Sequence, residues 1–196
     1  MPLSGDGAAR TSADQQRVGG RRGVATLVVS LVAAVAAVGA AAATPTSAHR
    51  AARVSALESG VLQQLNRIRA QHGLTPLHLN AKLSAAATQH SREMGFDGYF
   101  AHNSHDGTEF WKRIERWYSP SGYGYWSVGE NLLWSSPDVD PQRALDLWMH
   151  SPEHRANILA PRWREIGVSA VHLVSAPGTY HGLAVTIITT DFGVRR

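Results

Sequence analysis

The apolar positions after the first 50 residues predict helices in the first part of this region and strands at its end. Between residues 53 and 72, apolar side chains recur at steps of four, four and three, the spacing of one face of a helix. Asn80 is a suitable N-cap for a second helix, and a third helix is predicted to start near Asp106 or Thr108.

Two runs near the end of the chain, residues 166–174 and 183–192, are the strongest strand predictions, and a shorter strand is predicted at residues 128–134. The two long runs are apolar at successive positions, which is typical of a sheet covered on both faces. Pro177 and Gly178 between them indicate a hairpin-like connection. Because helices come first and strands cluster late, the pattern predicts an α/β sandwich rather than alternating βαβ units.

Residues 1–48 differ from the rest in composition and contain no aromatic side chain. Four arginines precede an uncharged stretch, residues 24–43, that ends in small residues. This order predicts a secretory signal peptide that is cleaved; the alternative is a signal anchor, since about 20 apolar residues can span a bilayer. In both cases the remainder is expected outside the cytoplasmic membrane, with residues 49–56 as a short linker and residues 57–196 as the folded domain.

Composition excludes several classes of protein. The chain has 196 residues and no cysteine, so a disulfide framework, a thiol nucleophile and a cysteine-ligated metal are ruled out. Without residues 1–48 the formal net charge falls from +4 to +2, because four arginines and two aspartates leave with them. After residue 50, lysine occurs only at Lys82 and Lys112, and the sequence shows no basic stripe that could follow phosphates, so no nucleic-acid partner is expected.

Three segments place ionisable side chains beside Gly, Pro, Asn or aromatic residues: YFAHNS, GENL and WMHSPEHRANIL. With the ending IGVSAV…TTDFG, they resemble the bacterial branch of the CAP superfamily, also called the SCP domain, over residues 57–194. The resemblance implies a three-layer α–β–α sandwich in a secreted or surface-exposed protein. It also implies a surface cleft lined by two histidines and one or two glutamates, which can hold a divalent cation, often zinc.

Carried onto this sequence, the resemblance assigns His102 and His154 to the two cleft histidines and Glu130 to the glutamate of the GEN motif. Neutral imidazoles are good zinc ligands, and Glu130 either completes the metal site or acts as the base on a metal-bound water. Many eukaryotic members carry a second glutamate three residues after the helix tryptophan, and Ser151 stands at that position here. A complete set of four cleft residues is therefore not expected.

Each cleft residue also has a structural explanation. For His102 it is a hydrogen bond from the ring to a nearby backbone group, and for His154 it is capping at the start of a helix. For Glu130 it is a buried carboxylate satisfied by backbone N–H groups. Glu109 and Glu153 are candidates to complete the cleft, although nothing in their spacing establishes it.

Three functions follow from this reading. The leading hypothesis is a CAP-domain protein that binds a divalent metal and an apolar or envelope-derived ligand, such as a lipid, a glycan or a peptide. One alternative is a metal-dependent, peptidase-like hydrolase with Glu130 as its base. The other is a structural factor of the cell envelope with a vestigial cleft.

A cluster of aromatic residues occupies one stretch before the predicted strand at residues 128–134. It is either core with a covering loop, or an apolar groove for the ligand. Membrane contact is expected only through residues 24–43, where these are not cleaved. The cluster consists of Trp111, Trp117, Tyr118, Tyr123, Tyr125 and Trp126.

Overall fold

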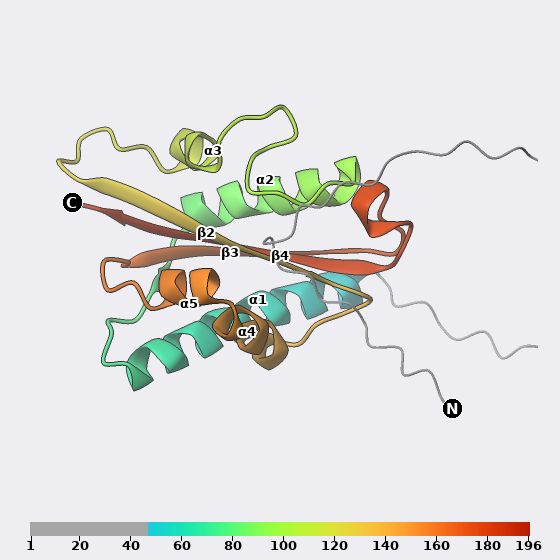
Figure 1. Cartoon of the computed structure of the whole chain (residues 1–196), viewed down its shortest axis with the longest axis horizontal. Helices are drawn as coiled ribbons and strands as arrows, with labels where there is room; N and C mark the ends of the chain where they lie inside the picture. Colours follow the sequence, from blue (N-terminus) through green and yellow to red (C-terminus); the bar gives the residue numbers. More distant parts are fainter. Residues whose placement is uncertain (1–46) are drawn as a thin grey trace, which may run out of the picture.

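The computed structural model describes residues 47–196, so the predicted export segment lies outside the described residues except for its last two (Figure 1). The elements in chain order are α1 (Ser47–Gln71), β1 (His78–Leu79), α2 (Ala81–Asp97), α3 (Phe110–Trp117), β2 (Trp126–Ser135), α4 (Pro141–His150), α5 (Pro152–Ile158), β3 (Glu165–Leu173), η1 (Gly178–Tyr180) and β4 (Val185–Arg195). Residues 49–56, predicted as a linker, are part of α1. Within residues 47–196, no helix has the length and apolar character needed to cross a membrane.

The strands form one sheet in the order β1-β3-β4-β2. β4 runs antiparallel to both of its neighbours, whereas the two-residue β1 pairs with β3 in parallel. Helices α2 and α3 lie over one face of the sheet, and α1, α4 and α5 lie over the other (Figure 1). The predicted three-layer α–β–α sandwich is therefore confirmed.

The boundaries of α2 follow from its capping residues. The Asn80 side chain accepts hydrogen bonds from the backbone N–H groups of Lys82 and Leu83, as the sequence predicted. The helix ends at Gly98, which has a left-handed φ of 72°. A Cβ at Gly98 would lie 2.8 Å from the carbonyl carbon of Pro177, so both the turn and this close approach require glycine.

Helix α3 begins at Phe110, later than the predicted start near Asp106 or Thr108. The Asp106 carboxylate accepts a hydrogen bond from the Thr108 N–H at 2.8 Å, and Gly107 has a φ of 83°. Asp106 therefore forms a turn with its own backbone instead of starting a helix.

The two faces of the sheet are packed differently. On the α1 side, one continuous apolar cluster includes Leu65, Trp148, Trp163 and Phe192. On the α2 side, two smaller apolar clusters, one around Met94 and Leu132 and one around Leu83 and Ile114, pack against the sheet. Charged and polar side chains are also buried on the α2 side, and together with His154 of α5 they form the candidate site.

Candidate functional site

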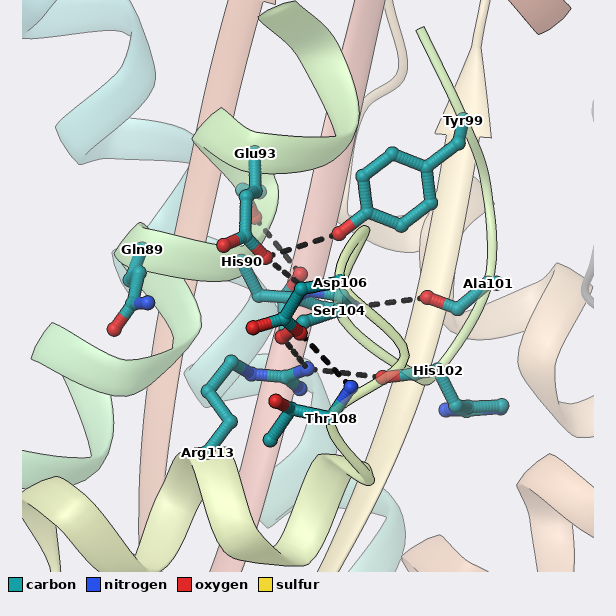
Figure 2. A network of polar contacts seen from close by, with 12 residues as sticks. Gln89, His90, Glu93, Tyr99, Ala101, His102, Ser104, Asp106, Thr108 and Arg113 are labelled. Carbon is teal, nitrogen blue, oxygen red and sulfur yellow. Dashed lines mark hydrogen bonds and ion pairs between the residues drawn. The ribbon is translucent and has the colours of Figure 1, made fainter. Parts of the chain in front are cut away.

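Glu130 on β2 is the centre of a buried polar cluster, and its side chain is 0% exposed. Its Oε1 is hydrogen-bonded to Nδ1 of His102 at 2.8 Å, and its Oε2 accepts a hydrogen bond from the guanidinium of Arg113 on α3. Arg113 also donates to the backbone carbonyl of His102 at 2.9 Å (Figure 2). The buried guanidinium of Arg113 therefore holds both the carboxylate of Glu130 and the backbone of His102. The same carboxylate orients the imidazole of His102.

His90 on α2 fixes the segment that carries His102. Its Nε2 donates to the carbonyl of Ala101 at 2.9 Å, and its Nδ1 lies 3.6 Å from the carboxylate of Glu93 (Figure 2). Burial, followed by the charge of Arg113, lowers the pKa of His90 to about 2. The ring is therefore neutral at physiological pH, which leaves the proton on Nε2 for the carbonyl.

A second carboxylate, Asp191 on β4, is paired in register with Glu130 and is fully buried. Among the described residues, neither of its oxygens receives a hydrogen bond. Burial and the neighbouring Glu130 raise the pKa of Asp191 well above its ordinary value, and burial also raises that of Glu130, although Arg113 lowers it. Because Arg113 hydrogen-bonds Glu130 and lowers its pKa, the arrangement favours a protonated Asp191 beside an ionised Glu130.

His154 on α5 supplies the second imidazole of the site. Its Nδ1 is hydrogen-bonded to the hydroxyl of Ser151 at 2.8 Å, and the residue is only 5% exposed. Burial, and then the charge of His102, lower the pKa of His154, whereas the carboxylate of Glu153 raises the pKa of both histidines. The charge of His102 thus contributes to keeping His154 neutral.

Asparagines dock α5 against β2 and so place His154. Asn157 donates from Nδ2 to the carbonyl of Glu130, and Asn131 donates from Nδ2 to the carbonyl of His154, both at 3.2 Å. A Cβ at Gly129 would lie 2.7 Å from Oδ1 of Asn157. The glycine of the GEN motif therefore allows α5 to approach the strand that carries the glutamate.

The sequence-predicted residues come together in part. His102 and Glu130 are in direct contact, and His154 is linked to them through its electrostatic interaction with His102 and through the docking of α5 on β2. Glu109 is not part of the cluster, because it forms an ion pair with Lys112 at 2.8 Å on the exposed side of α3.

Sequence reasoning assigned no role in the site to His90, Arg113 or Asp191. Signals for two of them exist in the sequence. Asp191 is a charged residue inside a strand predicted to be buried on both faces, and Arg113 directly precedes Ile114 on the inward side of α3. Buried charged side chains are rare unless they are paired, so each pointed to a partner elsewhere in the chain.

The donor atoms of the site limit how it can hold a metal. Both oxygens of Glu130 are engaged by His102 and Arg113, and no group of three or more His, Asp or Glu within residues 47–196 is arranged to hold a metal ion. The Nε2 atoms of His102 and His154 form no hydrogen bond with other described residues. A cation at this cluster would therefore have, among the described residues, only the two imidazole nitrogens as side-chain ligands, with Glu130 orienting His102 rather than ligating.

A sheet between two helical layers, with two imidazoles at its edge strand β2 and a buried glutamate behind one of them, defines an SCP-type sandwich. The chain belongs to the CAP family: the family model described as "Cysteine-rich secretory protein family" matches residues 62–183. This chain departs from that description in having no cysteine.

Two relatives and two solved structures illustrate the similarity. The uncharacterized protein YkwD of Bacillus subtilis is 32% identical over 128 residues, which is 65% of this chain and 48% of that protein. The uncharacterized membrane protein YlbC of the same organism is 29% identical over 57% of this chain and 30% of its own length. The chain thus spans half or less of these two relatives.

Among solved structures, an extracellular SCP-domain protein of Bacillus anthracis superposes with a TM-score of 0.60 at 24% identity, covering 79% of this chain and 45% of that one. A cysteine-rich secretory protein of Staphylococcus aureus gives a TM-score of 0.54 at 17% identity, covering 76% and 40%. At these identities the two structures support the fold.

Proposed function

We propose that this protein acts outside the cytoplasmic membrane as a binding protein whose recognition site is the imidazole pair His102 and His154. The observation that carries the proposal is the engagement of Glu130: it is buried, it is held by Arg113, and it hydrogen-bonds Nδ1 of His102. A carboxylate in this position fixes a histidine's orientation and leaves Nε2 for a ligand, as is common behind metal-binding imidazoles. The extracytoplasmic location rests on the predicted export segment and on the extracellular relative from Bacillus anthracis.

In this proposal the two Nε2 atoms hold a divalent cation such as zinc. Burial lowers the pKa of both histidines, so both are neutral at pH 7 and can donate a lone pair. A bound cation would supply an attraction for carboxylate, phosphate or carbonyl oxygens, the groups that an envelope-derived lipid, glycan or peptide offers. Exposed Glu153, whose charge acts on both rings, adds a further attraction for the cation.

A hydrolase with Glu130 as its base is less well supported. A general base must reach the proton it removes, directly or through one water. Glu130 is 0% exposed, and both of its oxygens already have partners. Its role in the proposal is therefore to position His102.

Zinc titration by calorimetry tests the proposal. Removing both imidazoles in His102→Ala/His154→Ala is expected to abolish the binding heat, whereas the matched double variant His72→Ala/His78→Ala, at two exposed histidines, keeps it. Glu130→Gln is expected to weaken zinc binding by roughly 10–100-fold, the usual effect of removing an outer carboxylate. Equal heats for wild type and the His102/His154 variant would contradict the proposal and favour a vestigial cleft in a structural protein.

A further inference from the structure

The aromatic cluster of α3, the loop after it and the start of β2 is divided between core and surface. Tyr118 is 0% exposed, whereas the loop that follows it exposes Tyr123 by 45% and Tyr125 by 40%. Helix α3 adds Trp111 and Trp117, which are 37% and 43% exposed. Half of the eight large hydrophobic side chains that the described residues expose therefore come from the stretch 111–125.

The loop is ordered although it projects from one end of the sheet (Figure 1). The backbones of Tyr125 and Arg196 exchange two hydrogen bonds, at 2.8 and 3.0 Å. The indole of Trp126 donates to the carbonyl of Tyr118 at 2.8 Å, and the N–H of Tyr123 donates to the carbonyl of Pro120 at 3.0 Å. The exposed tyrosines are thus held in place before any partner arrives, which lowers the entropy cost of binding.

Two guanidinium groups cover these rings. The guanidinium carbon of Arg195 lies 4.1 Å from the ring centre of Tyr118 and 4.8 Å from that of Tyr123, and the guanidinium of Arg196 lies 5.0 Å from the ring centre of Tyr125. Neither arginine forms an ion pair with a carboxylate of the described residues. An arginine stacked on a ring keeps N–H donors at the edge of its plane, where a phosphate can accept hydrogen bonds.

We infer that Tyr123, Tyr125, Arg195 and Arg196 form a Tyr–Arg surface that docks onto a membrane carrying acidic phospholipid headgroups. Tyrosine and tryptophan side chains are amphipathic and settle at the level of the headgroups, and nearby arginines are attracted to anionic lipids. The unpaired charge of the two guanidinium groups provides the complementarity to the phosphates. Docking on this surface does not depend on the imidazole pair, and it differs from contact through residues 24–43.

The absence of cysteine allows a direct test, because Ser121→Cys introduces a single thiol into the exposed loop. The full chain, labelled there with an environment-sensitive fluorophore, is mixed with vesicles of phosphatidylglycerol and phosphatidylcholine, or of phosphatidylcholine alone. The fluorophore is expected to report an apolar environment only with the anionic vesicles, and to lose this signal at roughly 0.5 M salt, where the Debye length is about 4 Å. A label at Ser175→Cys, in the exposed turn after β3, is expected to remain in water, because that turn lies at the other end of the sheet (Figure 1).

Variants identify the groups responsible. Arg195→Ala/Arg196→Ala is expected to weaken vesicle binding roughly fivefold for each arginine removed, whereas Arg195→Lys/Arg196→Lys retains most of it. Arg92→Ala/Phe96→Ser removes a matched cation–aromatic pair elsewhere, with the guanidinium 5.5 Å from the ring centre, and is expected to bind like wild type. Equal signals on both kinds of vesicle, or a signal at position 175 but not at 121, would overturn the inference. So would binding to a soluble anionic glycan with no response to vesicles.

Discussion

The two faces of the sheet bury different chemistry. The face under α1, α4 and α5 buries one apolar cluster, and Arg69 at its end donates to backbone carbonyls such as that of Ile158 at 2.7 Å. The face under α2 and α3 buries Arg113, Glu130 and Asp191 between two smaller apolar clusters. Apolar side chains of similar volume would stabilise the α2 face as well or better, since buried ion pairs lose hydration. The buried charges on the α2 face thus fix the position of His102 at a cost in stability. The two faces should therefore respond differently to mutation.

The largest expected effect comes from removing the buried cation. Arg113→Met leaves the Glu130 and Asp191 carboxylates without their guanidinium and frees the carbonyl of His102. We expect a loss of about 3–5 kcal/mol in the free energy of unfolding, the usual result of breaking a buried ion pair from one side. Urea denaturation followed by circular dichroism measures it.

A double variant separates charge from packing in that result. Arg113→Met/Glu130→Gln removes both charges of the pair, so it should recover part of the stability lost in Arg113→Met alone. Similar unfolding free energies for the single and double variants would show that Arg113 stabilises the protein by packing rather than by its charge.

A core truncation on the opposite face should cost stability without changing the site. Leu65→Ala removes a side chain that is 0% exposed in the large apolar cluster, and we expect a loss of about 3 kcal/mol. Because Leu65 lies across the sheet from Glu130, the pKa of His102 should stay at its wild-type value. NMR titration of the histidine ring protons measures that pKa, and a clear shift would mean that the two faces are coupled.

The buried histidine predicts acid sensitivity on the polar face. The pKa of His90 is about 2 in the folded protein, against about 6.5 in an unfolded chain, so below pH 6.5 only the unfolded state takes up this proton. Its contribution to stability is complete above pH 6.5 and falls as the pH drops, by about 2 kcal/mol at pH 5. Glu130 and Asp191 act in the opposite sense, since their raised pKa values favour the folded state at lower pH.

His90→Gln isolates the histidine from those carboxylates. Glutamine can still donate a hydrogen bond to the carbonyl of Ala101 but does not titrate, so the variant should lose about 2 kcal/mol less than wild type between pH 7 and pH 5. Urea denaturation at the two pH values gives the comparison. A parallel decline in the two proteins would assign the acid sensitivity to other groups.

The fold was more accessible from the sequence than the site, because its signals are local. Helix periodicity, the Asn80 cap and two apolar runs placed α2, β3, β4 and the end of α1 within a few residues, and late clustering of the strands indicated the layers. The start of α1 was predicted too late, since residues 49–56 are helical rather than a linker. The predicted start of α3 was wrong because the Asp106 carboxylate accepts a hydrogen bond from the backbone of its own turn, in competition with the helix. That competition depends on a side-chain geometry which periodicity does not register.

In the site, His102 and Glu130 came from a motif resemblance, whereas their partners depend on contacts between distant parts of the chain. Arg113 reaches Glu130 only because α3 packs over β2, and Asp191 faces Glu130 only through the register of β2 and β4. A shift of one residue in that register would turn Asp191 to the other face. Neither composition nor spacing determines the register. The buried charged residues could therefore be recognised in the sequence, but their partners could not be predicted.

The smallest effects should come from the caps of α2 and α4, which again contrast the two faces. Asp140 caps α4 through one hydrogen bond, from the N–H of Arg143 at 2.8 Å, so Asp140→Ala should cost about 1 kcal/mol. Asn80 caps α2 and also donates to the Glu165 carboxylate at 2.6 Å, so Asn80→Ala should cost up to about 2 kcal/mol. Asn80→Ser keeps a capping oxygen but loses the bond to Glu165, so it should fall between wild type and Asn80→Ala in urea denaturation. A larger loss of unfolding free energy for Asp140→Ala than for Asn80→Ala would show that the hydrogen bond from Asn80 to Glu165 on β3 adds nothing to the stability of the α2 cap.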